Sequence, residues 1–187
     1  MNTPKPGVDY WPDQLAWPKE EKPKQSNTLI KQAFCFIVLF ILLQASWQAL
    51  RDNDIGHFVR GTLTVRPAVE MIHFITPTIP ARAVGNQILA PGGGLVIKIG
   101  CEGVEALFIL IAALLSVPMT GRAKLRGVIN GSLLIYAVNE VRILVLFYAF
   151  RTDKALFQLI HVAIAPLLII AIAGAFYYHW LQKNHVA

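Results

Sequence analysis

Residues 34–43 read FCFIVLFILL, an unbroken apolar run at the centre of the longer segment 29–50. About 20 apolar residues in a helix match the thickness of the hydrocarbon core of a bilayer, so this segment is predicted to cross a membrane. The residues before it, 1–28, hold five prolines, four lysines and four acids, and are predicted to form a disordered cytoplasmic tail. A tail of this length is too long for a cleavable signal peptide, which indicates an uncleaved anchor.

Three further apolar segments follow, at residues 102–117, 127–150 and 155–181. The polar sequences MTGRAKLRG and RTDK lie between them and are predicted to be loops. The chain is 55% hydrophobic and 15% charged, whereas a typical soluble domain has about 25% charged residues. These values exclude a soluble enzyme and indicate an all-α integral membrane protein, a single polytopic domain over residues 29–187 with about four transmembrane helices.

The segment 51–100 contains no adequate span. Within it, residues 58–80 mix apolar side chains with charged residues and prolines, which favours an amphipathic helix lying on the membrane surface or inserted shallowly. Further along, NQIL and LVIKI flank a glycine-rich turn, and this pattern predicts a short β-hairpin ahead of Cys101.

Basic residues set the expected orientation. With four spans and a cytoplasmic N-terminus, Arg122, Lys124 and Arg126 lie in one short cytoplasmic loop, as the positive-inside rule requires. The 17 lysines and arginines are otherwise scattered, so the net charge of +6 does not indicate a nucleic-acid-binding surface. Residues 51–100 then lie on the outer face, and a full crossing by residues 58–80 would invert this assignment.

Arg142 is the most unusual residue of the predicted spans. An arginine inside a span costs roughly 2.5–3.5 kcal/mol on insertion scales and usually faces a polar interior or a cavity. Asn139 lies three residues earlier on the same helix face. The functional interpretation is a guanidinium directed into a site. The alternative is an arginine that extends to the membrane surface or pairs with Glu140 or Glu105.

Cys101 stands immediately before the predicted helix 102–117. A helix N-terminus favours the thiolate, whereas the carboxylate of Glu102 opposes it. Gly103 permits close approach of a substrate backbone. His161, in the outer half of the predicted fourth span, suits acid/base chemistry with a thiol. The alternatives are a small buried cysteine and a structural histidine.

Cys101, Arg142 and His161 are thus predicted to reach a similar depth on the outer side, although they come from three different helices. No spacing of histidines and carboxylates matches a metal motif, and PGGGL lacks the context of a phosphate-binding loop, so neither a metal nor a cofactor is expected. The two cysteines, Cys35 and Cys101, make no disulfide framework.

The ordered set Cys101-Glu102-Gly103, Asn139-Glu140-Val141-Arg142 and His161 resembles the motifs of the exosortase/archaeosortase family. The resemblance covers about residues 84–168, and the short chain is similar to the compact members of the exosortase H type. Many members of the family have Ser, Thr or Asn after the cysteine, where this chain has Glu102.

This resemblance implies a cysteine transpeptidase or peptidase of the bacterial cytoplasmic (inner) membrane, with its active site on the outer face. It implies Cys101 as the nucleophile, Arg142 as the stabiliser of thiolate and oxyanion, and His161 as the general acid/base. The supporting residues would be Asn139, Glu102 and Gly103. The implied partners are membrane lipid and exported proteins with a C-terminal sorting signal of the PEP-CTERM type, made of a short motif, a transmembrane helix and a basic cluster. The substrate would pass to an acceptor through a thioester.

Two other classes stay open. A small transporter or channel subunit would use Arg142 to bind an anion or to act as a gate, with Cys101 incidental. A non-catalytic partner in envelope assembly would tolerate replacement of both residues.

Overall fold

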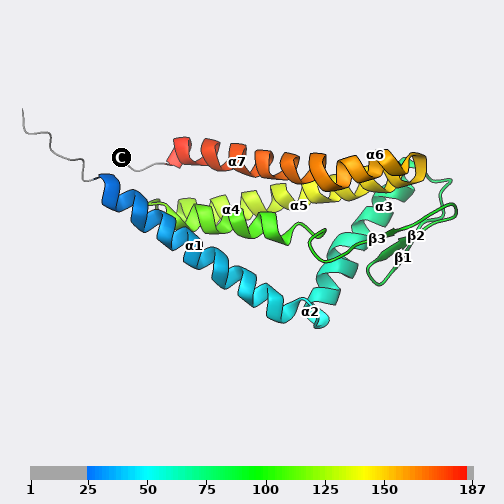
Figure 1. Cartoon of the computed structure of the whole chain (residues 1–187), viewed down its shortest axis with the longest axis horizontal. Helices are drawn as coiled ribbons and strands as arrows, with labels where there is room; N and C mark the ends of the chain where they lie inside the picture. The colour runs from blue at the N-terminus through cyan, green and yellow to red at the C-terminus, as the bar shows by residue number, and fades with distance from the viewer. Residues whose placement is uncertain (1–24, 185–187) are drawn as a thin grey trace, which may run out of the picture.

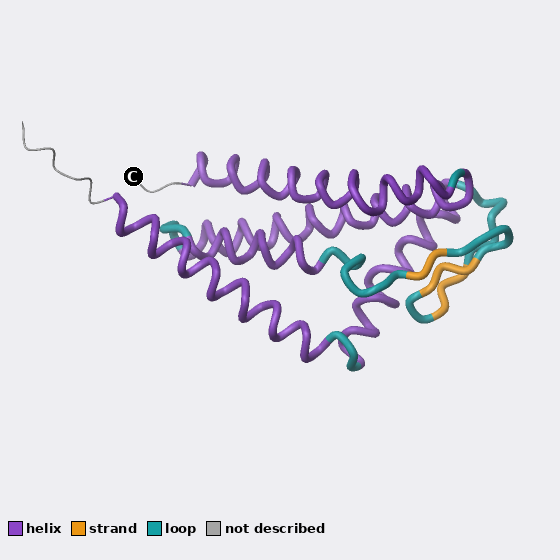
Figure 2. The backbone as a smooth tube through the Cα atoms, in the orientation of Figure 1, coloured by secondary structure: helices purple, strands orange, loops and turns teal. Residues whose placement is uncertain are grey.

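The computed structural model describes residues 25–184. The predicted tail, residues 1–28, lies outside the described residues as far as residue 24, and its last four residues already belong to helix α1 (Gln25–Leu50). Long helices run side by side through most of the molecule, and a small sheet lies at one end (Figures 1 and 2). The chain is therefore mostly helical, as predicted.

Within residues 25–184, three helices are long and apolar enough to cross a membrane, at Thr28–Leu50, Gly121–Thr152 and Lys154–Asn184. They correspond to the first, third and fourth predicted spans. The first of these helices begins, and the last of them ends, at the end of the molecule that is remote from the sheet (Figure 1). These lengths and compositions are those of a membrane protein.

The second predicted span is shorter than expected. Helix α4 (Val104–Ser116) has 13 residues, a length of about 20 Å at 1.5 Å per residue, against a hydrocarbon core of about 30 Å. Two residues set its ends. Gly103 adopts a left-handed conformation at φ +79°, and Val117 is extended because it precedes Pro118. The predicted range 102–117 was therefore too long at its start, and α4 packs against α1, α5 and the last helix of the chain.

Helix α5 (Gly121–Thr152) includes most of the segment that was predicted to be a basic loop. Its N-cap is Thr120, whose Oγ1 accepts a hydrogen bond from the Ala123 N–H at 3.3 Å. The loop prediction was wrong because a capped helix accommodates basic residues in its first turns, where their long side chains reach the surface. The predicted turn RTDK is likewise reduced, since α5 ends at Thr152 and the next helix begins at Lys154.

The last long helix is continuous but not uniform. It consists of α6 (Lys154–Leu159), the π-helical segment η2 (Ile160–Ile164) and α7 (Ala165–Asn184). Asp153 caps α6, because its Oδ1 accepts a hydrogen bond from the Ala155 N–H at 2.7 Å. π-Helical turns inside long helices are frequent at functional sites.

The predicted amphipathic helix is present as three consecutive segments, α2 (Asp54–His57), the π-helical η1 (Phe58–Val65) and α3 (Arg66–Ile75). One side of this continuous rod is buried, through residues such as Val65, Val69 and Ile72. The helix ends at Ile75, earlier than the predicted residue 80, because Thr76 precedes Pro77 and leaves the helical conformation.

The predicted hairpin is confirmed and is part of a larger sheet. Strands β1 (Arg82–Val84), β2 (Gln87–Leu89) and β3 (Leu95–Val96) form an antiparallel sheet in the order β1-β2-β3. The predicted pair is β2–β3. Strand β1 escaped prediction, and it joins β2 through a tight turn in which Gly85 has φ +57°.

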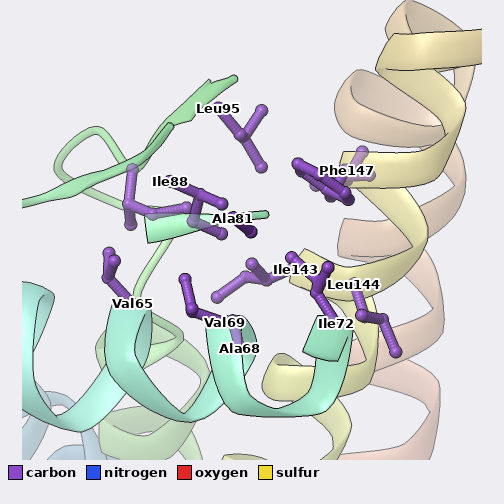
Figure 3. Close-up of a cluster of buried hydrophobic side chains, with 12 residues drawn as sticks. Val65, Ala68, Val69, Ile72, Ala81, Ile88, Leu95, Ile143, Leu144 and Phe147 are labelled. Carbon is purple, nitrogen blue, oxygen red and sulfur yellow. The ribbon is translucent and has the colours of Figure 1, made fainter. Parts of the chain in front are cut away.

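A buried apolar cluster joins the sheet to η1 and α3 and to α5 (Figure 3). Its largest fully buried side chains include Phe147 from α5, Ile72 from α3 and Ile88 from β2. Arg151 also binds the sheet, since its Nη1 donates to the carbonyl oxygens of Pro91 at 2.7 Å and Gly93 at 3.1 Å. The sheet therefore packs against the C-terminal half of α5, the half that carries Arg142.

Candidate functional site

Cys101 lies in the short connection between the sheet and α4. Its N–H donates to the carbonyl oxygen of Lys98 at 3.0 Å, which closes a turn after β3. Gly100 and Gly103 flank it in left-handed conformations, at φ +90° and +79°. The thiol is half-buried against the apolar cluster under the sheet. The sequence placed Cys101 directly before the helix, and the structure inserts Glu102 and Gly103 as two further non-helical residues.

Asn139 packs against the start of α4. A Cβ atom on Gly103 would lie 2.9 Å from the Asn139 Cγ and 3.0 Å from its Oδ1, so only glycine fits at this contact. The Asn139 side chain is 1% exposed, and its Oδ1 has no hydrogen-bond partner among the described residues. The structure thus brings together two of the supporting residues named from the sequence.

Arg142 has no carboxylate partner. Between residues 25 and 184 the one ion pair is Arg51–Asp52, at 3.5 Å, so the alternative pairings with Glu140 or Glu105 are not formed. The Arg142 Nε atom is buried and makes no hydrogen bond within the described part of the chain. Its charge lies close enough to act on the Cys101 thiol. Arg142 is therefore a cation within electrostatic range of the thiol whose buried Nε has no hydrogen-bond partner among the described residues.

Two cavities meet at Arg142. One, of about 480 Å³, lies between α5 and the α6–η2–α7 helix and is otherwise apolar, with Val141, Ile160 and Leu168 among its walls. The other, of about 190 Å³, lies between the start of α4 and α7 and is lined by Gly100 and Gly103. A single guanidinium therefore borders an apolar space within the helices and a more polar space near Cys101.

Opposing effects act on the pKa of the Cys101 thiol. Burial raises the pKa of the Cys101 thiol above its ordinary value, and Glu102 adds to this effect. The charges of Arg142 and Lys98, and a hydrogen bond from the Lys98 backbone, act in the opposite direction but do not overcome burial. To the two opposing effects expected from the sequence, the structure adds a third, because removal of the thiol from water outweighs the favourable charges in the free protein.

His161 lies in the π-helical segment η2 and faces the same region. Its ring stacks on Phe157, with the centroids 5.4 Å apart and the planes 5° from parallel. The His161 Nδ1 is buried without a hydrogen-bond partner in residues 25–184, and Arg142 and Lys98 lie within electrostatic range of the ring. Arg142 is therefore within electrostatic range of both Cys101 and His161, and among the described residues Cys101 and His161 form no hydrogen bond with each other.

Lys98 is a residue of this neighbourhood that sequence reasoning missed. It is exposed, and its charge acts on both Cys101 and His161. A single lysine in a predicted hairpin gave no signal, because its approach to His161 depends on how the sheet docks onto the helices.

Two acidic side chains of the described residues are buried. Glu102 is 8% exposed and Glu140 is 4% exposed, and neither carboxylate has a hydrogen-bond partner among the described residues. Both were considered only as modifiers or partners of other groups. In the described part of the chain, no three His, Cys, Asp or Glu side chains come together as a metal site.

The fold and composition define this chain as an integral membrane protein whose polar site lies where the sheet meets the helices. The chain matches no family model, no curated protein and no solved structure.

Proposed function

We propose that this protein is a membrane-embedded cysteine transpeptidase or peptidase of the exosortase type. The observation that supports it best is that Arg142, which has no carboxylate partner among the described residues, is within electrostatic range of the Cys101 thiol and lines a cavity with Gly100 and Gly103 at the uncapped start of α4. A nucleophilic sulfur next to a fixed cation and free helix N–H groups is an arrangement suited to acyl transfer, in which negative charge develops on the carbonyl oxygen.

The raised pKa of Cys101 gives His161 a specific part in the proposed mechanism. A thiol that is protonated in the free enzyme needs a base, and His161 takes its proton as the sulfur attacks the scissile carbonyl carbon. A C–S bond forms, and the carbonyl electrons move to the oxygen, where Arg142 stabilises the oxyanion. The C–N bond then breaks as His161 returns the proton to the leaving amine, and an acyl thioester remains on Cys101.

The second half of the reaction reverses these roles. An amine, hydroxyl or water attacks the thioester carbonyl carbon and gives its proton to His161. Collapse of the second tetrahedral intermediate breaks the C–S bond, and the sulfur recovers the proton. The products are the free thiol and a substrate joined to its acceptor, so no oxidant, metal or cofactor enters the balance.

The proposed substrates are exported proteins with a C-terminal sorting signal, and the proposed location is the outer face of the bacterial cytoplasmic membrane. The apolar cavity of about 480 Å³ between α5 and the last helix supports a substrate that arrives with a hydrophobic segment. In this arrangement α4 is a further membrane helix beside the three long ones. Its N-terminal end lies below the membrane surface, so that Cys101 lies at the level of the scissile bond.

A membrane transporter is the second candidate, favoured by the position of Arg142 between two cavities. An anion would then bind the guanidinium on its way between them. This function does not need a thiol, so Cys101→Ser should leave transport intact while it abolishes transpeptidation.

The test is a processing assay in cells. An exported protein with a motif–helix–basic cluster C-terminus is co-expressed with the wild-type protein, with Cys101→Ala or with Cys35→Ala, and the cleaved form is measured on blots. Cys35 is the matched control, since it is the other cysteine and lies exposed on α1. We expect cleavage with the wild type and Cys35→Ala and none with Cys101→Ala. Equal cleavage by a well-expressed Cys101→Ala protein would exclude the proposed function.

A further inference from the structure

Strand β3 leads directly to Cys101 and forms one edge of the sheet. Burial alternates along this segment, with Leu95 and Ile97 buried and Val96 and Lys98 exposed. An edge strand offers a row of unpaired N–H and C=O groups to another extended chain. The question is which groups of β3 point to that open side.

The register of β2 and β3 shows which groups of β3 point to the open side. In an antiparallel pair, residues alternate between positions whose N–H and C=O both face the partner strand and positions whose groups both face away. The Ile97 N–H donates to the Asn86 carbonyl oxygen at 2.9 Å, and the Asn86 Nδ2 donates to the Ile97 carbonyl oxygen at 3.1 Å. Ile97 therefore faces β2, and Val96, one residue earlier, directs its N–H and C=O away from β2.

These outward groups are unused. Within residues 25–184, the Val96 N–H and C=O make no hydrogen bond with another part of the chain, and β2 is the one strand that pairs with β3. The Val96 side chain is 48% exposed. The edge at Val96 thus combines free backbone groups with an accessible surface.

The edge also lies at the right distance from the thiol. Two extended residues from Val96 to Lys98 cover about 6.6 Å, and the turn from Lys98 to Cys101 adds less than about 7 Å between Cα atoms. Cys101 is therefore within about 14 Å of Val96, the length of four extended residues. A peptide paired with β3 reaches the sulfur with a short stretch of chain.

We propose that the extended peptide of the substrate next to its scissile bond binds as a fourth strand along β3, pairing with the Val96 backbone. This rests on the proposed function, because a binding strand beside Cys101 has a purpose only if Cys101 attacks a peptide. Backbone pairing holds the chain extended, and the exposed Val96 and Lys98 contact alternate side chains of the peptide. The occupant is a peptide rather than a second copy of this chain, because a two-residue edge is too short to hold a dimer.

The opposite edge of the same sheet supplies a matched control. Strand β1 pairs Val84 with Gln87 across a tight turn, so Ala83 directs its N–H and C=O away from β2, as Val96 does on β3. Ala83 is exposed, and its edge lies roughly 10 Å from β3, across two strand spacings. Val96→Pro and Ala83→Pro each remove one outward N–H and spare the bonds between strands.

The first measurement is the initial rate of substrate processing by these two variants and by the wild type. We expect Val96→Pro to slow processing by up to about tenfold, the upper end of the effect of losing one hydrogen bond, and Ala83→Pro to change it less than about twofold. Equal rates for all three proteins, with Cys101→Ala inactive, would overturn the binding strand and leave the proposed function in place. Absence of processing by the wild type would instead remove the proposed function.

The second measurement does not depend on how the sheet tolerates proline. A photo-crosslinking amino acid replaces Val96 or Ala83 in the full-length Cys101→Ala protein, co-expressed with the substrate, and crosslinked species are identified by mass spectrometry. We expect the substrate segment beside the scissile bond to be attached at position 96 and not at position 83. Crosslinks at position 96 only to a second copy of the protein or to lipid, or equal substrate crosslinks at both positions, would overturn the inference.

Discussion

The two ends of helix α4 contrast in how their polar groups are satisfied. At the C-terminal end, the Lys124 Nζ donates to the Leu115 carbonyl oxygen at 2.6 Å and the Ser116 Oγ to the Ala113 carbonyl oxygen at 2.9 Å. At the N-terminal end, Gly103 provides no side-chain cap. One end of the same helix is closed, and the other leaves its N–H groups open.

The open end is surrounded by further unpartnered groups. Among the described residues, buried polar atoms without a hydrogen bond occur on Glu102, on Asn139, which contacts Gly103, and on Arg142, which shares a cavity with Gly103. Further such atoms occur elsewhere, on Arg51, Arg60, Glu140 and His161. Each such group costs about 1–3 kcal/mol of stability, so a cluster of them is not expected from folding alone. The difference between the two ends indicates that the closed end stabilises the fold, and under the proposed function the open end is the one available to a substrate.

The largest effect is expected at Arg142. Arg142→Met removes the group that stabilises the oxyanion, so we expect processing to fall about 10²–10³-fold while the thermal unfolding midpoint is unchanged or higher, because the guanidinium has no partner to lose. Initial rates and unfolding midpoints measured in detergent check this. Arg126→Met, an exposed site on the same helix, is the control and should retain full activity. A large loss of stability in Arg142→Met would assign the arginine to the fold.

The contact between Gly103 and Asn139 gives the next effect. Gly103→Ala places a Cβ 2.9 Å from the Asn139 Cγ in a left-handed backbone, so we expect a stability loss of about 1–2 kcal/mol and reduced processing. Addition of Asn139→Ala should recover part of the stability, since it removes the clash. Gly174→Ala is the control, because nothing lies within 4 Å of its added Cβ. Failure of the double variant to regain stability would contradict the contact.

The thiol pKa provides a pH-dependent prediction. Glu102 contributes to the raised pKa of Cys101 and Arg142 opposes it, so Glu102→Gln should lower that pKa and Arg142→Met should raise it further. Because the thiolate is the reactive form, iodoacetamide should label Cys101 faster in Glu102→Gln and slower in Arg142→Met at any pH below the thiol pKa. Labelling rates against pH in a Cys35→Ala background measure this. Identical profiles in the three proteins would remove both charges from the neighbourhood of the thiol.

The smallest effect is expected just after the closed end of α4, where Thr120 caps the start of α5. Thr120→Ala removes the side-chain cap of α5, and we expect a loss of about 1 kcal/mol in stability with normal processing. Parallel unfolding and processing measurements check it. A strong loss of processing without a change in stability would show that the two ends of α4 do not divide their roles.

The sequence was sufficient to predict the elements whose signal is local. The apolar run around Phe36 predicts α1, the alternation after Pro91 predicts β3, and the amphipathic pattern around Val69 predicts α3. It failed where one residue decides an end. Gly103 in a left-handed conformation shortens α4, and Thr120 as a cap turns a basic loop into helix.

The sequence singles out candidate residues for the site but does not predict their electrostatics. Cys101, Arg142 and His161 stand out because reactive or charged groups are rare in apolar segments. The raised pKa of Cys101 and the approach of Lys98 depend on how the sheet packs against α5, a contact between segments far apart in the chain. No spacing within the sequence encodes that packing.

The most direct measurement is to detect the acyl intermediate on Cys101. The wild-type protein is purified after co-expression with the substrate, digested and analysed by mass spectrometry, with Cys101→Ser in parallel. We expect a peptide containing Cys101 that carries the truncated substrate through a bond sensitive to hydroxylamine, and an increase in this species when the acceptor is withheld. Processing that continues while Cys101 remains unmodified, or substrate attached to Cys35 in its place, would contradict the proposed mechanism.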